Sequence, residues 1–221
     1  MAIKLSKGDK SVVKKETGAP VQNLTVGVNW GKITAVQKIG LSFVDKMIGK
    51  ASAAVGAMQA VDLDLTIVTF DKSGNKLAEC AFYNKKPFNG YISHSGDDRK
   101  GDDEDDGLDN ERIQFRGLDV ATKTSVQSAF IVLNSYSRQK FDQIPYINLA
   151  IYDGLFGLAD KAPRLMTFDL TNDSAFKGSE GLILARLDKS AQGWELKAIG
   201  QPTDDGSIAA LVRRIEREHL N

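Results

Sequence analysis

The segment from Gly96 to Glu111, GDDRKGDDEDDGLDNE, constrains this chain most, because it crowds carboxylates whose charges repel one another. Nine acidic residues there are opposed only by Arg99 and Lys100. Three glycines let the backbone turn tightly enough to direct several oxygens toward one point. The segment therefore predicts a loop that binds a hard cation. Calcium, which accepts about six to eight oxygen ligands in irregular geometry, suits it better than magnesium.

The EF-hand calcium loop does not fit this segment. A pattern that starts at Asp102 places Glu104, Asp106 and Gly107 correctly, but its last position is Ile113, which cannot supply the bidentate carboxylate. The flanking residues also lack the amphipathic helices of an EF-hand, and those after the loop alternate loosely like a strand as far as Val120. The alternative is a solvated acidic loop without metal. We favour a metal because the run is internal, punctuated by glycine and bounded by strand-like segments.

Composition limits the classes of protein to consider. With 221 residues and 42% hydrophobic content, residues 1–221 are expected to form a single domain. The formal net charge is zero, which gives no electrostatic basis for nucleic-acid binding. Cys80 is the only cysteine, so an intramolecular disulfide is excluded. A reducing compartment follows, and the first residues contain no apolar core of signal-peptide length, so we expect a cytoplasmic protein.

Short alternating segments separated by glycine and polar turns predict a mainly β fold, a two-sheet β-sandwich. The clearest hairpin joins Val61–Phe70 to Lys76–Tyr83 through a polar tip. The other candidate strands are Ile3–Val13, Asn23–Trp30, Ser128–Ser135, Tyr146–Tyr152, Arg164–Leu170, Gly181–Asp188 and Trp194–Gly200.

Two segments predict short helices. Apolar residues between Ile39 and Met58 recur at nearly helical spacing, which suggests a helical insertion at about residues 33–60. It is expected to lie against the sandwich; the alternative is an amphipathic element that docks a partner or contacts a membrane surface peripherally. Charged residues interrupt it, so a membrane span is not expected. After Ser207, a possible N-cap, apolar residues fall on one face of a C-terminal helix.

Several short sequence segments, in a fixed order along the chain, resemble those of a known family. In sequence order these are IKLSKGD at 3–9, LTVGVNW at 24–30, VDLDLT at 61–66, AFYN at 81–84, HSGDDRKGDD at 94–103, AIYDG at 150–154 and WELKAIGQ at 194–201. Together they cover most of the chain, which resembles the TerD family of bacterial tellurium-resistance and general-stress proteins. The resemblance implies a calcium-binding β-sandwich without catalytic activity. The chain departs from the family pattern in a longer connection between Trp30 and Val61 and in extra residues around Gly107.

The resemblance assigns the metal site to the DLD pair and the acidic loop. Alternate residues of a strand project to the same face, so Asp62 and Asp64 can meet a loop folded over that face. The loop is rich enough in acid for one or two calcium ions. The full candidate ligand set is Asp62, Asp64, Asp97, Asp98, Asp103, Asp105, Asp106, Asp109 and Glu111.

The expected function is that of a non-enzymatic cytoplasmic stress protein, a binding or scaffold module whose calcium site orders a surface for protein partners. One alternative is a metal-dependent hydrolase that uses the acidic cluster with His94 as a base, although the chain has only two histidines. Another is a structural subunit of a membrane-associated stress complex that uses the 33–60 insertion for contact. Cys80 lies in a strand pattern and is expected to be a core residue.

Overall fold

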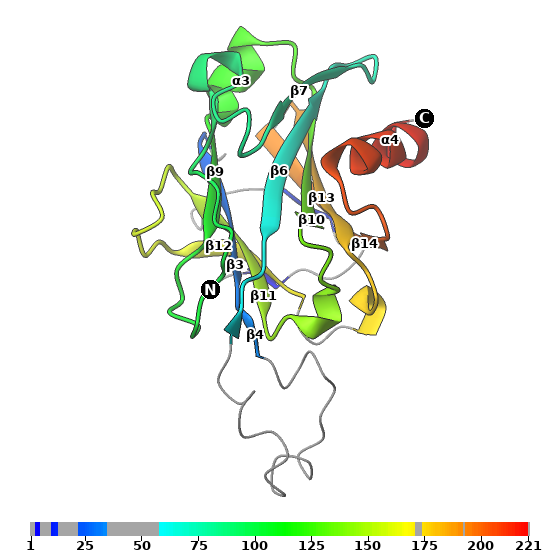
Figure 1. The fold of residues 1–221 in the computed structure, drawn as a ribbon. Helices are drawn as coiled ribbons and strands as arrows, with labels where there is room; N and C mark the ends of the chain where they lie inside the picture. Colours follow the sequence, from blue (N-terminus) through cyan, green and yellow to red (C-terminus); the bar gives the residue numbers. More distant parts are fainter. Residues whose placement is uncertain are drawn as a thin grey trace, which may run out of the picture.

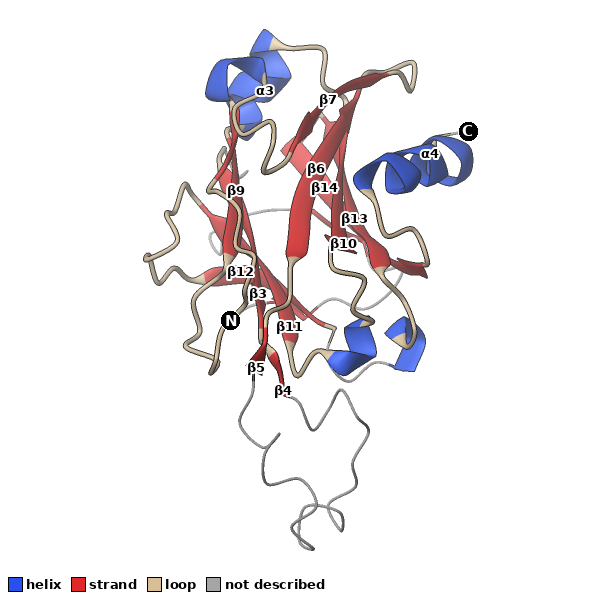
Figure 2. Ribbon diagram, in the orientation of Figure 1, coloured by secondary structure: helices blue, strands red, loops and turns tan. Residues whose placement is uncertain are grey.

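The computed structural model describes residues 3–4, 10–12, 22–34, 58–170, 174–191 and 193–220. Over these residues the chain forms two β-sheets that pack face to face, with a helix on the outer side of one of them (Figures 1 and 2). The predicted two-sheet β-sandwich is thereby confirmed. That residues 1–221 form a single domain stays a prediction.

The first sheet has six strands in the order β1-β12-β11-β3-β9-β8. All neighbours are antiparallel except β1 and β12, which pair in parallel. The long connection that carries the acidic run joins its last two members, β8 and β9. The strands are β1 (Ile3–Lys4), β3 (Leu24–Trp30), β8 (Ile92–His94), β9 (Glu111–Phe115), β11 (Ile147–Asp153) and β12 (Arg164–Asp169).

The second sheet also has six strands, in the order β2-β14-β13-β10-β6-β7, and every pairing in it is antiparallel. The predicted hairpin is its β6–β7 pair. The carboxylate of Asp71 holds the turn by accepting backbone bonds from Ser73 and Asn75, both at 2.8 Å. The strands are β2 (Lys10–Val12), β6 (Leu63–Phe70), β7 (Lys76–Cys80), β10 (Ser128–Ser135), β13 (Gly181–Ser190) and β14 (Gly193–Thr203).

The main core lies between the sheets and follows the two-residue alternation of strands. In β6, Leu63, Leu65 and Ile67 face inward and are fully buried, whereas Val68 and Phe70 belong to a second cluster on the other side of the sheet. The same alternation turns Asp64 away from the main core. The acidic positions at the start of β6 therefore lie on the outer face of the second sheet.

Helix α4 (Ile208–His219) covers part of that outer face (Figure 1). Ser207 caps it as predicted, because its side chain accepts a bond from the backbone of Ala210. The apolar stripe of the helix packs on Val68, Phe70 and Phe130. The C-terminal helix expected from the sequence is confirmed, and Cys80 is a buried core residue as expected.

Two segments differ from expectation. The strand pattern after the acidic run ends at Phe115, and α3 (Gly117–Lys123) follows instead of continued strand. Asp119 in its first turn and Lys123 in its last suit the helix dipole, and the indole of Trp194 donates to the Gly117 carbonyl at 3.3 Å. These tertiary and end effects outweigh the loose alternation. Three short 3-10 turns are η1 (Phe88–Gly90), η2 (Phe141–Gln143) and η3 (Ser174–Phe176).

The predicted helical insertion at about 33–60 is tested only at its ends. Those ends form a two-stranded antiparallel pair, β4 (Ile33–Thr34) with β5 (Met58–Gln59), and not helix. The pairing brings the two ends of the insertion together beside the sandwich. Residues 35–57 lie outside the described part of the chain.

Candidate metal centre

The acidic loop is attached to the ends of both sheets. The backbone N–H of Val61, just before β6, donates to the Lys100 carbonyl at 2.9 Å. Asp102 donates to the carbonyl of Trp30 at 3.0 Å and accepts from Lys32 at 2.9 Å, which ties the loop to the end of β3. Gly101 has a φ of 70° and lies against the Trp30 indole, where a Cβ would be too close. The loop thus crosses from one sheet to the other directly beside Asp62 and Asp64.

This crossing brings three of the predicted ligands together. Asp62, Asp64 and Asp97 each place a carboxylate oxygen within 4.8 Å of the others. The three line a cavity of about 130 Å³, whose remaining walls are Phe82, Arg99 and Tyr136. The cluster joins the start of β6 to the start of the acidic loop, which is the arrangement expected from the DLD pair.

The electrostatics of this cluster favour a cation. Burial, reinforced by the neighbouring Asp97 and Glu111 carboxylates, raises the pKa of Asp62 to about 6. Burial raises the pKa of Asp64 to about 7, although the bond from Asn134 Nδ2 at 2.9 Å opposes the rise. A cation beside two carboxyl groups whose pKa values are raised in this way stabilises their charged form.

The amide of Asn134 contacts the same cluster through its nitrogen. It faces Asp64 across the β6–β10 ladder, and its side chain is buried. While its nitrogen donates to Asp64, its Oδ1 has no hydrogen-bond partner among the described residues. A buried amide oxygen without a partner is costly, and amide oxygens are calcium ligands. The three carboxylates of the cluster supply the hard oxygen donors that a divalent cation such as calcium prefers.

Asp98 and Glu111 shape the loop around the cluster. Asp98 Oδ1 accepts from the backbone of Lys100 at 2.8 Å and of Gly101 at 3.1 Å, which makes it the organiser of the turn. Glu111 is fully buried and accepts from Leu65 N at 2.9 Å and Asp98 N at 3.2 Å. Burial raises the pKa of Glu111. Both carboxylates neighbour the cluster, but three of their oxygens accept from backbone donors and Asp98 Oδ2 accepts from Asn110 Nδ2 at 3.1 Å.

His94 fixes the entry to the loop. Its Nδ1 accepts from Gly96 N at 3.0 Å, so the ring proton belongs on Nε2, which lies 3.2 Å from the Leu65 carbonyl and 3.5 Å from Glu111 Oε2. The side chain is fully buried. A histidine with both nitrogens engaged inside the fold is placed for structure and not as an exposed base.

The remaining loop acids lie outside the cluster. Asp103 forms an ion pair with Lys32 at 2.9 Å. Asp105 accepts from Asn29 Nδ2 at 2.9 Å and from its own loop backbone, and Asp106 accepts from Leu108 N at 2.8 Å. These contacts place the three side chains toward β3 and the loop tip. The predicted role of Asp103, Asp105 and Asp106 as ligands stays a prediction.

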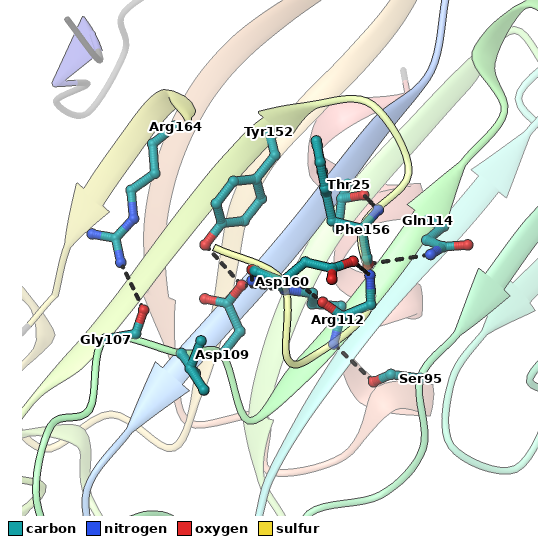
Figure 3. Close-up of polar contacts among 12 residues, drawn as sticks. Thr25, Ser95, Gly107, Asp109, Arg112, Gln114, Tyr152, Phe156, Asp160 and Arg164 are labelled. Carbon is teal, nitrogen blue, oxygen red and sulfur yellow. Dashed lines mark hydrogen bonds and ion pairs between the residues drawn. The ribbon is translucent and has the colours of Figure 1, made fainter. Parts of the chain in front are cut away.

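Asp109 occupies a different environment on the outer face of the first sheet (Figure 3). Its Oδ2 accepts from Arg112 Nε at 2.6 Å and from the Tyr152 hydroxyl at 2.7 Å. Gly27 of β3 provides the space, because a Cβ there would collide with the carboxylate. Arg112 in turn donates to the carbonyls of Gly157 and Asp160. Asp109 thus links the end of the acidic loop to the connection between β11 and β12.

Comparison with known proteins places this geometry in a family. The sequence matches the TerD domain over residues 1–214, which is nearly the whole chain. The chain belongs to the TerD family. Two curated relatives are the tellurium resistance protein TerX of Serratia marcescens and the stress response protein SCP2 of Bacillus subtilis (strain 168), each 24% identical. The alignments cover 96% and 97% of this chain and 99% of each relative.

The fold agrees with a solved TerD structure. A homologue of telluride resistance protein (TerD) from Streptomyces coelicolor A3(2) superposes with a TM-score of 0.59 at 14% identity, covering 86% of this chain and 95% of that one. This likeness shows the TerD fold. In the described part of this TerD chain, no helix is both long and apolar enough to cross a membrane.

Sequence reasoning missed four residues of this TerD site. Phe82, Arg99 and Tyr136 line the cavity, and Asn134 contacts Asp64. Phe82 and Arg99 lie in two of the segments that carry the family resemblance, although the expected ligand set includes neither. Asn134 and Tyr136 carry no local signal, since their position depends on the register of β10 against β6.

Proposed function

We propose that this TerD-family protein is a calcium-binding module of the stress response. The cluster of Asp62, Asp64 and Asp97 at the crossing of the acidic loop over β6 is the observation that supports it. The proposal places the protein in the cytoplasm, where it acts without catalysis as a binding or scaffold unit for protein partners. Its relatives named for tellurium resistance and stress response suggest the physiological setting.

Calcium suits the cluster better than magnesium for a geometric reason. The oxygens come from the start of β6 and from the acidic loop, so their arrangement is irregular. Calcium tolerates such irregularity, whereas magnesium demands near-octahedral geometry and gives up its water reluctantly. The geometry supports one ion at this cluster, because the acids of the loop tip have protein partners.

The effect of the ion would be to stabilise and order the loop. In the metal-free protein, mutual repulsion of the carboxylates opposes the folded loop. A ligand that binds only the folded state stabilises it by about 2.7 kcal/mol at a hundred times its Kd. The same ion would fix the surface that the acidic loop and the adjacent cavity present to partners.

A catalytic role gains no support from the groups near the cluster. His94 is buried with both ring nitrogens engaged. The Cys80 thiol is buried as well, and burial raises its pKa to about 12. Neither is placed as a base or nucleophile facing the cavity, so a binding function accounts for the site more simply than hydrolysis.

Isothermal titration of metal-free protein with calcium and magnesium tests the proposal. We expect about one calcium per chain, bound more tightly than magnesium. Asp64→Asn and Asp97→Asn should abolish the heat of binding, because each removes a charge from the cluster. Asp103→Asn is the matched control: it removes an acid of the same loop that pairs with Lys32, and calcium binding should persist. The proposal is refuted if titration with calcium gives no heat of binding and the addition of calcium leaves the melting temperature unchanged.

A further inference from the structure

The cavity beside the Asp62, Asp64 and Asp97 cluster is also lined by a cationic side chain, Arg99, whose hydrogen-bond donors are only partly used. Arg99 lines the cavity with a side chain that is 74% exposed, and its Nε contacts Asp97 Oδ2 at 2.9 Å. Among the described residues, its terminal nitrogens have no other hydrogen-bond partner. An exposed ion pair of this kind contributes little to stability. Folding therefore does not explain why an arginine stands beside the cluster.

Two aromatic side chains complete this wall. Tyr136 follows β10, where its backbone N–H donates to the Asp62 carbonyl at 2.9 Å, yet 66% of the residue is exposed. Phe82 is half-buried and lies edge-on to Tyr83, which is also exposed. Exposed aromatic rings beside a polar cavity mark a place where a ligand with an apolar body can dock.

The charge of the cavity depends on the cation. Without it, three carboxylates outweigh the single guanidinium, and an anion is repelled. A divalent cation at the cluster makes the cavity neutral overall and leaves a guanidinium edge facing it. The cavity of about 130 Å³ has room for about four water volumes of roughly 30 Å³ each, enough for an ion and a small anionic group. Three carboxylates also leave several of calcium's roughly six to eight oxygen positions open to other ligands.

We propose that this cavity is a cation-dependent binding site for an oxyanion group, a phosphate monoester or a carboxylate. The oxyanion faces the bound cation and accepts hydrogen bonds from the free edge of Arg99 and from the Tyr136 hydroxyl. Phe82 and Tyr136 flank the apolar or aromatic group that carries it. The inference rests on the proposed calcium site and specifies what the ordered surface recognises.

Reciprocity gives the inference a quantitative consequence. If calcium raises the affinity for the anion, the anion must raise the affinity for calcium by the same factor. The protein would then respond to calcium and its ligand jointly. Arg99 acts here as an anion-recognition residue whose positive charge repels the cation, so its removal should not weaken calcium binding.

Titration with phenyl phosphate and, in a separate arm, benzoate tests the site by calorimetry, in calcium and after calcium removal. We expect one probe or both to bind the calcium-loaded protein and neither to bind without calcium; the arm that responds identifies phosphate or carboxylate as the preferred group. Arg99→Gln should weaken probe binding about 10-fold or more while calcium still binds. Tyr136→Phe separately measures how much the Tyr136 hydroxyl contributes to probe binding. Arg138→Gln, an exposed arginine paired with Glu180, is the matched control and should bind the probe as the wild type does.

The outcomes separate this inference from the proposed function. Calcium binding with no response to either probe overturns the oxyanion site alone. Equal probe binding by the wild type and Arg99→Gln, or probe binding in the absence of calcium, also overturns it. Failure of calcium to bind refutes the calcium module and this site together. Because the Arg99 side chain is exposed, Arg99→Gln should fold as the wild type does, and an unchanged melting temperature checks this.

Discussion

Arg112 and Asp109 form a buried ion pair, with Nε and Oδ2 2.6 Å apart and each side chain only 2% exposed. The guanidinium lies 4.9 Å from the centre of the Tyr152 ring, and the Tyr152 hydroxyl donates to the same Asp109 oxygen. The other guanidinium nitrogens bind carbonyls of the connection between β11 and β12. One pair therefore fastens two loops to the outer face of the first sheet (Figure 3).

Replacing Arg112 with methionine should destabilise the protein strongly. The substitution leaves the Asp109 carboxylate buried without its counterion, which typically costs about 3–5 kcal/mol. Urea unfolding measures the loss. The control is Arg138→Met, which breaks an exposed pair with Glu180 and should cost less than about 1 kcal/mol. Equal losses for the two variants would show that the buried pair is not a major support. The double variant Asp109→Leu with Arg112→Met should recover part of the stability.

Gly27→Ala should destabilise the protein for a steric reason. A Cβ at Gly27 enters the space of the Asp109 carboxylate, and the ion pair leaves that carboxylate little freedom to move. We expect a loss of about 1–3 kcal/mol in urea unfolding. Gly157→Ala is the matched control in the connection that Arg112 holds, because a Cβ there meets Asp160 at an ordinary 3.5 Å. The steric account fails if both alanines cost the same.

The sequence predicted the sandwich and part of the site because both depend on local patterns. Alternation identified β6 as a strand, and the DLD spacing placed Asp62 and Asp64 on one face, where the structure finds them with Asp97. The N-cap at Ser207 and the apolar stripe behind it identified α4 in the same way. Each of these inferences uses residues close together in the chain.

The contacts that local patterns could not reveal depend on register and on loop paths. Asn134 reaches Asp64 only because β10 pairs with β6 in one register. In the sequence, Asp109 is one more acid of the loop, but in the fold its carboxylate accepts from Arg112 of β9 and Tyr152 of β11. The strand alternation places Arg112 on the outer face of the sheet, and the connection between β11 and β12 covers it there. The acidic run therefore predicted a cluster without showing which acids enter it.

Cys80 should react with a thiol reagent such as DTNB only after unfolding. Burial raises the pKa of its thiol from 9.0 to about 12, which lowers the thiolate fraction near neutral pH roughly a thousandfold, and burial also excludes the reagent. The absorbance of the thiolate product that DTNB releases follows the reaction with and without denaturant. Ser73→Cys, at the exposed tip of the β6–β7 hairpin, provides a fast-reacting control within the same chain. Rapid labelling of Cys80 in the native wild type would contradict the burial of this strand.

The metal-free protein should lose stability as pH rises through the range in which Asp64 ionises. Its pKa is about 7 in the folded state against an ordinary value of 3.8, so between these values the folded state binds more protons than the unfolded state. The contribution is therefore complete below pH 3.8 and is lost as pH approaches about 7. Asp62, with a pKa of about 6, adds a contribution of the same sign.

Urea unfolding in calcium-free buffers across this pH range measures that slope. Asp64→Asn removes the titrating group while keeping an acceptor for Asn134, so its stability should depend less on pH than that of the wild type. Asp103→Asn, outside the cluster, should keep the wild-type slope. Saturating calcium should flatten the wild-type slope as well, because a cation favours the ionised carboxylate. Identical slopes for the wild type and Asp64→Asn without calcium would show that the cluster does not hold a proton, and the electrostatic case for a cation at this site would lose its main support.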